Sequence, residues 1–212
     1  MARVWSNGGK RVVDLVCATL VGFLLTPIFI IVAALIRLRL GSPVLFRQER
    51  LGRDMETFKI YKFRTMTASV DDAGELLPDE NRLTDLGRFL RRSSIDELPQ
   101  IFNVLKGQMS FIGPRPTLPS YRELLHQNYP KRFDALPGLT SLPAVRGRNA
   151  LEWDEKFVLD VEYVEKLSFL TDLRIALQTI PVVFSRQGVS KGGMATTTRY
   201  DHEQRVENGE GR

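Results

Sequence analysis

The hydrophobic pattern of the chain is dominated by one uncharged segment near the N-terminus. Residues 15–36 read LVCATLVGFLLTPIFIIVAALI. At 1.5 Å per residue, roughly 22 residues form a helix of about 33 Å, which is long enough to cross the hydrocarbon core of a bilayer. The run is too long for a secretory signal, and Arg37 follows it without a small-residue cleavage region. We therefore expect the segment to be retained in the membrane.

Whether this segment crosses the membrane depends on its flanks and on its middle. Basic residues lie on both sides of it: Arg3, Lys10 and Arg11 before, and Arg37, Arg39, Arg47, Arg50 and Arg53 after. Because positive charge favours the cytoplasmic side, a single straight span cannot satisfy both flanks. Pro27 removes a backbone donor near the middle, and the Thr26 hydroxyl can bond to a freed carbonyl. The pattern predicts a re-entrant helix broken at Thr26 and Pro27; a proline-kinked span is the alternative.

The next part of the pattern predicts a small β-hairpin. Two β-prone runs, 44–46 and 58–64, flank a turn-like LGRD sequence at 51–54, which places a hairpin within 43–66. The second run, FKIYKFR, interleaves basic with aromatic residues. Proteins that bind single-stranded nucleic acid use such a pattern, but one face of a half-buried strand looks the same.

Three later segments have the apolar spacing of amphipathic helices. The apolar positions are Leu83, Leu86, Phe89 and Leu90 in the first, Phe157, Val161 and Val164 in the second, and Leu173, Ala176, Leu177 and Ile180 in the third. In the first, Arg88, Arg91 and Arg92 lie off the apolar stripe. That helix either rests on anionic headgroups or presents a solvated charged face. We expect loops at 69–82 and 136–149.

Composition narrows the classes of partner. The net charge of +5 and the pI near 9.5 indicate an anionic partner, such as a phosphate substrate, an anionic lipid or nucleic acid. The single cysteine, Cys17, excludes an internal disulfide and a cysteine-based metal cluster. With only His126 and His202, the chain has no histidine-rich zinc site and little scope for a Ser-His-Asp triad.

The candidate chemistry lies in the sequence SIDELPQ at 94–100. Ser94 and Glu97 have the spacing of a capping box, and acidic residues in a first turn complement the helix dipole, so plain capping is one interpretation. Pro99 complicates it, since proline disfavours helical angles at the residue before it. The helix proper is then expected to begin at Pro99 and run to Lys106, with Gly107 ending it.

Two adjacent carboxylates are more than capping requires. Asp96 can attack phosphorus and hold an acyl-phosphate. Glu97 is then free to bind a hard cation, because Mg²⁺ is typically held by one or two carboxylates together with substrate phosphates. Arg115, in the GPRP sequence at 113–116, could bind phosphate oxygens with two hydrogen bonds. A rigid surface loop with a solvated arginine is the alternative interpretation of GPRP.

A resemblance to a known family follows from five sequences in order: the hydrophobic segment, FKIYKFRTM at 58–66, RRSSIDELPQIFNVLKGQMSFIGPRP at 91–116, PGLT at 137–140 and GRNALEW at 147–153. From about Lys10 to Tyr200 the chain strongly resembles the bacterial sugar transferases, the monotopic polyprenyl-phosphate phosphoglycosyl transferases. DELPQ followed by GPRP is highly specific. The sequences GVSK at 188–191 and ATT at 195–197 are most similar to small, catalytic-domain-only members that transfer phospho-N,N′-diacetylbacillosamine or a related amino sugar.

The resemblance implies a two-step reaction at the cytoplasmic face of the bacterial inner membrane. Asp96 would attack the β-phosphorus of a UDP-sugar and release UMP, and undecaprenyl phosphate would then take the phosphosugar. Glu97 matches the position that binds Mg²⁺. Three basic residues match positions near the substrate phosphates: Lys62, Arg91 and Arg115.

Further positions match the family with less definite roles. Asp160 matches another acidic position of the active site, although an ion pair with Lys156 four residues earlier is the alternative. Arg146 and Arg148 are weaker candidates for contacts with the nucleotide. The sequence SLPA at 141–144 departs from the Gly-Leu-x-Gln of many relatives, which affects the expected nucleotide or sugar contacts and not the carboxylate chemistry.

The sequence thus predicts a mixed α/β, mainly helical fold with one small β-hairpin, in a monotopic membrane protein with interfacial amphipathic helices. We expect a re-entrant membrane helix over 1–40, a catalytic domain at the cytosolic face over 41–198 and a disordered polar tail over 199–212. The expected function is transfer of a sugar 1-phosphate to undecaprenyl phosphate as the first membrane step of glycoconjugate assembly, with Mg²⁺ as cofactor and without a nucleic-acid partner. A membrane-anchored basic scaffold without catalysis is the alternative.

Overall fold

The computed structural model of the protein describes residues 5–147 and 150–185. The predicted polar tail, the GVSK and ATT sequences and Arg148 lie outside these ranges. The α-helices are α2 (Lys10–Leu24), α3 (Thr26–Arg39), α4 (Asp79–Arg82), α5 (Asp85–Arg92), α6 (Ile101–Leu105), α7 (Arg122–Asn128), α8 (Leu142–Arg146), α9 (Trp153–Glu165) and α10 (Phe169–Ser185). The strands are β1 (Leu45–Leu51), β2 (Thr57–Phe63), β3 (Ser110–Ile112) and β4 (Gly138–Thr140). The shorter helical turns are η1 (Trp5–Gly9), η2 (Arg53–Met55), η3 (Ile95–Gln100), η4 (Pro119–Tyr121) and η5 (Pro130–Phe133).

The fold is mixed α/β and mainly helical, as predicted. β1 and β2 form an antiparallel hairpin in which Leu45 pairs with Phe63 and Leu51 with Thr57. The first half of β2 has the alternation of a half-buried strand, because Phe58 and Ile60 are buried while Thr57 and Lys59 are exposed. Phe63, on the opposite face, is buried in a second cluster with α3. A second sheet, the parallel pair β3–β4, was not predicted, because its strands are too short to show a period in the sequence.

The hydrophobic segment is two helices, not one. α2 and α3 bend by 60° across Leu25, and among the described residues only this bent pair, and no single helix, has the length and apolarity to cross a membrane. Pro27 lies in the first turn of α3, and the Thr26 hydroxyl donates to the Gly22 carbonyl at 2.9 Å. The bend thus lies directly before the predicted break at Thr26 and Pro27, and a re-entrant path through a membrane stays a prediction.

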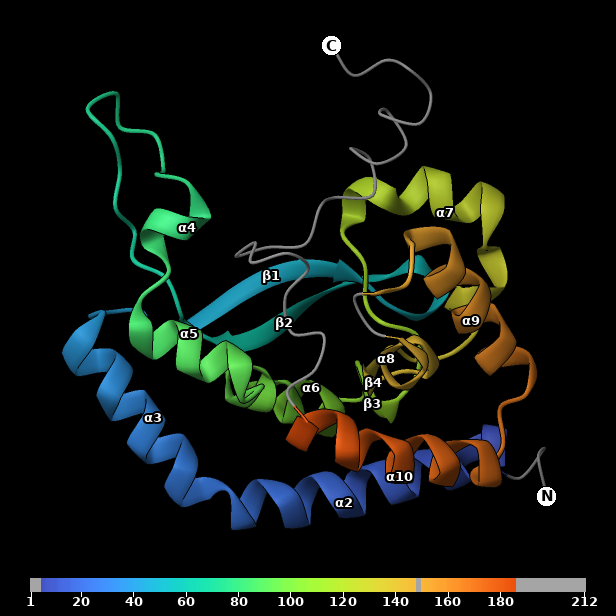
Figure 1. Ribbon diagram of the computed structural model, residues 1–212. Helices are drawn as coiled ribbons and strands as arrows, with labels where there is room; N and C mark the ends of the chain where they lie inside the picture. Colours follow the sequence, from blue (N-terminus) through green and yellow to red (C-terminus); the bar gives the residue numbers. More distant parts are fainter. Residues whose placement is uncertain (1–4, 148–149, 186–212) are drawn as a thin grey trace.

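Both halves of this pair pack against the rest of the protein. Ala18 of α2 is fully buried in a cluster with Ile60, Ile101, Val104 and Met109. Val32 and Ile36 of α3 belong to a second cluster, with Phe63 and Leu90. Figure 1 shows α2 and α3 running along one side of the molecule, with the β1–β2 hairpin and α5 on their inner side.

Polar contacts fix the start of α2 to the body of the protein. Lys10 forms an ion pair of 2.6 Å with the buried Asp172 of α10. Arg11 donates to the Leu105 carbonyl at 2.9 Å, at the C-terminal end of α6. Asp14 accepts from the backbone N–H of Phe111 at 3.1 Å. Lys10 and Arg11, which precede the hydrophobic segment, are therefore held against the part of the protein that follows the segment.

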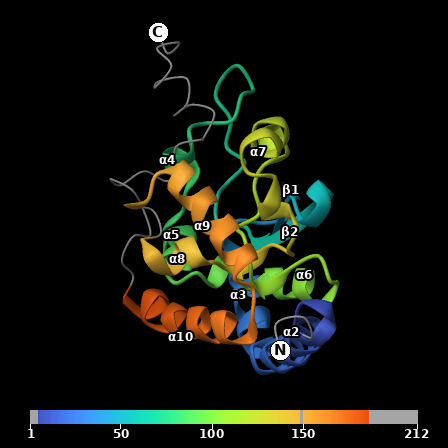
Figure 2. The same cartoon turned by 90° about the vertical axis from the view of Figure 1, so that its right-hand side faces the viewer.

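The outer faces of α2, α3 and α10 are apolar and exposed. In both views these three helices lie on one side of the molecule (Figures 1 and 2). Their exposed large apolar residues include Val12, Val16, Leu20, Phe23, Leu24, Ile30, Ile31, Leu38, Leu170, Leu173, Leu177 and Ile180. Exposed apolar side chains in this number on neighbouring helices are typical of a site that binds a partner or a membrane.

Two predicted helices have faces that differ from a simple core stripe. In α10, Leu173, Leu177 and Ile180 are exposed, whereas Asp172 and Ile175 face inward. The inward position of Asp172 is stabilised by Lys10, and by the Tyr163 hydroxyl, which donates to it at 2.7 Å. In α5, Leu90 is buried but Phe89 is 58% exposed. The segment 69–82, predicted as a loop, ends in the single turn of α4.

Candidate active site

The paired carboxylates lie on the 3₁₀ turn η3 and not in the first turn of an α-helix. Ser94 before them has a left-handed backbone (φ 57°), and its side chain makes no capping bond. The Glu97 N–H instead bonds to the Ser94 carbonyl at 3.2 Å. The capping-box interpretation is therefore wrong, and the helix proper begins at Ile101, two residues later than predicted. Pro99 and Gln100 belong to the 3₁₀ turn η3, which runs directly into α6.

α6 is fixed to β2 by a buried amide. The Asn103 side chain accepts from the Tyr61 N–H at 3.2 Å and donates to the Lys59 carbonyl at 2.8 Å. Asn103 thus bonds to the backbone N–H and C=O groups of β2 as a neighbouring strand would. These bonds fix α6, and with it the preceding turn η3, against the hairpin. Gly107 ends the helix with a left-handed φ of 80°, as predicted.

Glu97 is bound by two cations that come from different elements. Lys62 Nζ of β2 lies 2.7 Å from Glu97 Oε1, and an Arg115 Nη lies 2.8 Å from the same oxygen. The Glu97 side chain is 24% exposed, while that of Arg115 is 58% exposed. Both contacts use Oε1, so Oε2 is not engaged by either cation. The Arg115 side chain is thus partly exposed to solvent, but its guanidinium is held at the Glu97 carboxylate.

The two carboxylates have opposite electrostatic surroundings. Burial, and then the charge of Glu97, raise the pKa of Asp96 to about 6. Three cations oppose this shift: Lys62, Arg91 and Arg115. For Glu97, burial alone would raise the pKa, but the charges of Arg115 and Lys62 outweigh it and hold the pKa far below its usual range. At neutral pH the site presents one firmly paired carboxylate beside a buried, more basic one.

Arg91 reaches the site because α5 packs closely on the chain after β2. A side chain at Gly87 would place its Cβ 1.9 Å from the Thr65 carbonyl oxygen, so only glycine permits this approach. Arg91 Nε donates to Thr65 Oγ1 at 3.1 Å. All five residues expected to act on the phosphates are therefore brought together: Asp96, Glu97, Lys62, Arg91 and Arg115.

The GPRP loop is packed on the PGLT sequence. Gly113 donates to the Thr140 carbonyl at 3.1 Å, and Gly138 donates to the Pro114 carbonyl at 2.9 Å. A Cβ at Gly113 would lie 2.2 Å from the Leu136 oxygen, and one at Gly138 would lie 2.1 Å from the Gly113 nitrogen. Two sequences that are separate in the chain thus form one rigid support for Arg115.

A buried ion pair also contacts the loop that carries Arg115. Arg132 donates to Asp160 at 2.8 Å and to the Arg115 carbonyl oxygen at 2.9 Å. The two side chains are only 2% and 3% exposed. Asp160 therefore does not pair with Lys156, and it reaches the site through Arg132. Sequence reasoning missed Arg132, since nothing distinguishes it from its neighbour Lys131, which is an exposed partner of Glu165.

The expected nucleotide contacts receive less support. Arg146 is the last residue of α8, and its guanidinium lies 3.6 Å from the Glu162 carboxylate. About half of its side chain is exposed, and within the described ranges it forms no ion pair with Asp96 or Glu97. The departing sequence SLPA begins α8: Ser141 Oγ accepts from the Ala144 N–H at 3.3 Å as an N-cap. The substitutions in this loop are thus compatible with a short, capped helix.

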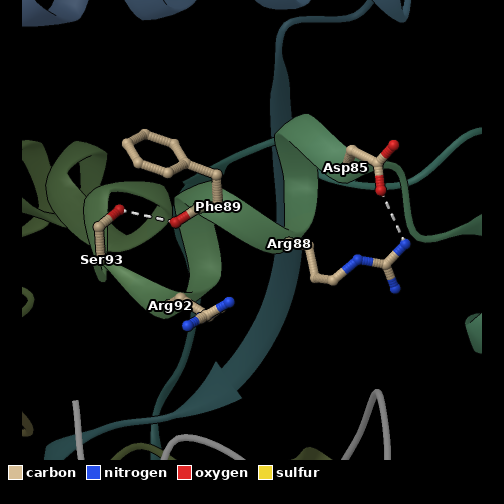
Figure 3. Close-up of a pocket in the computed structure, with 5 residues that line it drawn as sticks. All are labelled: Asp85, Arg88, Phe89, Arg92 and Ser93. Atoms are coloured by element: carbon tan, nitrogen blue, oxygen red, sulfur yellow. Dashed lines mark hydrogen bonds and ion pairs between the residues drawn. The ribbon is translucent and has the colours of Figure 1, made fainter.

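A hollow lies elsewhere, against α5 (Figure 3). It measures about 250 Å³ and is lined by Asp85, Arg88, Phe89, Arg92 and Ser93. Arg88 pairs with Asp85 at 3.1 Å there. Its lining includes none of Lys62, Arg91, Asp96, Glu97 and Arg115.

The site fits a magnesium ion only if substrate supplies part of the coordination. Within the described ranges, no group of three or more His, Cys, Asp or Glu side chains is placed to hold a metal. Mg²⁺ needs only one or two carboxylates when substrate phosphates complete its shell. Glu97 and its neighbour Asp96 meet that requirement.

Comparisons with known proteins agree with the geometry. Residues 5–186 match the family described as "Bacterial sugar transferase". The chain is 44% identical over 191 residues, 90% of its length and 95% of the relative's, to "Uncharacterized sugar transferase EpsL" of Bacillus subtilis (strain 168). It is 40% identical over 191 residues, 85% of its length and 72% of the relative's, to the "UDP-glucose:undecaprenyl-phosphate glucose-1-phosphate transferase" of Caulobacter vibrioides. A relative of the same name in Klebsiella pneumoniae is 39% identical over 181 residues, which cover 81% of this chain and 39% of that longer protein.

The family match covers most of the chain, and it includes Asp96, Glu97 and the three cations around them. Arg132 and Asp160, which sequence motifs did not connect, lie within the matched range as well. The chain belongs to the bacterial sugar transferase family.

Proposed function

We propose that this protein transfers a sugar 1-phosphate from a UDP-sugar to undecaprenyl phosphate through a phosphosugar intermediate on Asp96. The observation that carries the proposal is the pair of adjacent carboxylates with separate surroundings. Glu97 is tied to Lys62 and Arg115, while Asp96 is buried beside them and forms no ion pair with any residue in 5–147 or 150–185. Relatives named as UDP-glucose:undecaprenyl-phosphate glucose-1-phosphate transferases support the choice of donor class and acceptor.

In the first step, a carboxylate oxygen of Asp96 attacks the β-phosphorus of the UDP-sugar. A new phosphorus–oxygen bond forms to Asp96, and the bond from that phosphorus to the bridging oxygen breaks, so UMP leaves with the electron pair. In the second step, an oxygen of undecaprenyl phosphate attacks the same phosphorus. The bond to Asp96 then breaks, and the free carboxylate is regenerated.

The neighbouring residues have distinct roles in this scheme. Lys62, Arg91 and Arg115 stabilise negative charge on the phosphoryl oxygens, most strongly when it increases in the transition state. The raised pKa of Asp96 makes its carboxylate a stronger nucleophile than an ordinary aspartate. Mg²⁺, when bound through Glu97, would supply further neutralisation of the diphosphate.

The surface of the protein supports action at a membrane. The exposed apolar faces of α2, α3 and α10 lie on one side, as a protein embedded in one leaflet requires. The 60° bend and the attachment of Lys10 to Asp172 both favour a re-entrant pair whose two ends lie on the same side. We place the catalytic domain at the cytoplasmic face of the bacterial inner membrane, where a UDP-sugar is available.

The test is UMP release by the purified full-length protein in detergent with Mg²⁺. UDP-glucose is the first donor to supply, because relatives are named for it. UDP-N,N′-diacetylbacillosamine is the second, because the C-terminal sequences resemble amino-sugar members. Wild-type protein should release UMP and make lipid-linked product, and Asp96→Asn should do neither, because an amide is too weak a nucleophile. Without acceptor, mass spectrometry should find a phosphosugar adduct on Asp96.

A matched control is Asp85→Asn, which alters an exposed carboxylate outside the site. It should retain wild-type turnover. If Asp96→Asn retained near-normal turnover, the covalent mechanism would be refuted. If the wild-type protein released no UMP from any UDP-sugar, the membrane-anchored scaffold would become the better interpretation.

A further inference from the structure

Arg50 is a charged side chain near the carboxylates that has no role in the scheme above. The hairpin register pairs Arg50 with Phe58 and Phe46 with Lys62. Residues two apart on a strand share a face, so Arg50 lies on the same face of the hairpin as Lys62. Lys62 is the β2 residue that binds Glu97. From the sequence alone, Arg50 is only one of the basic residues that follow the hydrophobic segment.

The guanidinium of Arg50 is fixed at one end and unsatisfied at the other. An Nη of Arg50 donates to Gln48 Oε1 at 2.6 Å. Its Nε is buried and has no hydrogen-bond acceptor among the described residues. A buried donor on a charged group is costly when it is unpaired. Protein atoms cover Nε, so a bound anion reaches it when the guanidinium turns while its Nη stays on Gln48.

The charges around Arg50 indicate what kind of acceptor this is. Burial, and then the charge of Arg115, lower the pKa of Arg50 to about 10, so it stays a cation at neutral pH beside another cation. Four cationic side chains then surround two carboxylates: Lys62, Arg91, Arg115 and Arg50. The cluster has more positive than negative charge, and an anion with several charged oxygens would balance it.

We propose that Arg50 is a further anion-binding residue of this site, and that its guanidinium turns on binding to donate to a phosphoryl oxygen of a substrate. Gln48 is a positioning residue that holds one Nη of Arg50 during this turn. This inference rests on the proposed function, in which two substrates carry phosphoryl oxygens. They are the diphosphate of the UDP-sugar and the phosphate of the lipid acceptor.

Steady-state kinetics can separate the two sources. In a mechanism with a covalent intermediate, kcat/KM for the UDP-sugar reports only the first half-reaction, and kcat/KM for undecaprenyl phosphate only the second. We expect Arg50→Ala to lower at least one of these by about ten- to a hundredfold, which corresponds to one charge-assisted hydrogen bond. A fall in the first assigns Arg50 to the diphosphate, and a fall in the second assigns it to the lipid phosphate. Arg50→Lys should recover part of the loss.

Arg47 provides the matched control. It lies on the same strand with an exposed side chain, but on the opposite face, where its guanidinium lies 5.7 Å from the centre of the Tyr61 ring. Arg47→Ala should leave both values of kcat/KM within about twofold of wild type. If Arg50→Ala lowered the melting temperature but left both values unchanged, Arg50 would be a structural residue and the inference would be wrong.

A binding measurement keeps the inference separate from the proposed function. Inorganic pyrophosphate, titrated calorimetrically into the full-length protein in detergent, should bind Arg50→Ala about tenfold more weakly than wild type or Arg47→Ala. This readout does not require turnover, so it can succeed even if no UDP-sugar is a donor. Active enzyme whose Arg50→Ala variant keeps wild-type pyrophosphate affinity and both kcat/KM values would refute the inference and leave the proposed function intact.

Discussion

At the residue scale, the site separates two carboxylates that are adjacent in the chain. Glu97 shares one oxygen between Lys62 and Arg115, so it stays ionised well into the acid range. Asp96 is buried, and its pKa is raised to about 6. Two titratable groups whose surroundings shift their pKa values apart are typical of different chemical roles. A more basic carboxylate is suited to attack as a nucleophile, and Glu97 keeps one oxygen that neither Lys62 nor Arg115 engages.

Asp96→Asn is expected to stabilise the metal-free protein at neutral pH. Because its pKa is raised, Asp96 binds a proton more tightly in the folded state than in the unfolded chain. The free energy of unfolding therefore falls as the pH rises from about 4 to 6, and the full penalty is present above that range. The neutral amide removes it, which should raise the free energy of unfolding by about 1 to 3 kcal/mol at pH 7.5 and by little at pH 4.

Unfolding of both proteins in detergent with EDTA, followed at these two pH values, checks this. Asp85→Asn, whose side chain is 99% exposed, should change stability by less than about 0.5 kcal/mol. Equal stabilities of Asp96→Asn and wild type at pH 7.5 would mean that ionised Asp96 is not penalised in the fold.

Arg115→Lys tests the geometry of GPRP separately from its charge. Lysine keeps the positive charge but loses the planar pair of donors, and one charge-assisted hydrogen bond contributes about 1.5 to 3 kcal/mol. We expect kcat/KM for the UDP-sugar to fall about ten- to a hundredfold with folding intact. Arg122→Lys, on the exposed surface of α7, is the control. A wild-type value for Arg115→Lys would favour the solvated-loop interpretation of GPRP.

At the scale of elements, three connections converge on the loop that carries Arg115. The loop follows β3, it is packed on β4 through Gly113 and Gly138, and its carbonyl is bound by Arg132 of η5. Asp160 of α9 holds Arg132 in turn. α9 thus contributes to the site without contacting the carboxylates, which explains why an acidic residue far along the chain matches the family.

Removing one partner of the buried ion pair should destabilise the protein strongly. Arg132→Met leaves Asp160 buried without its cation, which typically costs about 3 to 5 kcal/mol. The double variant Arg132→Met with Asp160→Leu removes the unpaired charge and should recover most of that stability. It does not restore the bond to the Arg115 carbonyl, so we expect kcat/KM for the UDP-sugar to stay about tenfold or more below wild type.

Thermal unfolding and initial rates on the same preparations measure both effects. Lys131→Met is the control next in sequence, because its pair with Glu165 is exposed and should contribute no more than about 1 kcal/mol. Wild-type kcat/KM in the double variant would show that Arg132 serves stability alone.

At the scale of the whole molecule, one side is apolar and the body above it carries the polar site. α2, α3 and α10 provide that side, although α10 lies more than 120 residues from the others in the chain (Figures 1 and 2). The ion pair between Lys10 and Asp172 joins α2 to α10. A re-entrant arrangement requires the start of α2 and the catalytic body to lie on the same side of the membrane.

Cysteine labelling in intact bacterial cells tests this topology. In a Cys17→Ser background, a probe at Ser6→Cys should not react with a membrane-impermeant maleimide until the cells are permeabilised. A probe at Asp85→Cys, which reports the catalytic body, should behave identically. Labelling of the Ser6→Cys probe from the periplasm would establish a true span and overturn the re-entrant arrangement. Pro27→Ala restores a backbone donor and should move some molecules toward the spanning form.

The sequence alone determined the features that depend on local pattern. The apolar run, its break at Thr26 and Pro27, the hairpin and the left-handed Gly107 all follow from periodicity and from backbone restrictions of proline and glycine. The carboxylates, Lys62, Arg91 and Arg115 followed from motifs that resemble the family. Their convergence agrees with that resemblance, although their roles stay predictions.

Only the tertiary structure decided which side chains are paired and which faces are covered. It replaced the capping interpretation of Glu97 with its two cations, and it paired Asp160 with Arg132 and not with Lys156. In α10 the apolar stripe faces outward, because Lys10 and Tyr163 stabilise Asp172 on the buried face of the helix. Burial and charge partners come from segments far apart in the chain, and no local pattern contains that information.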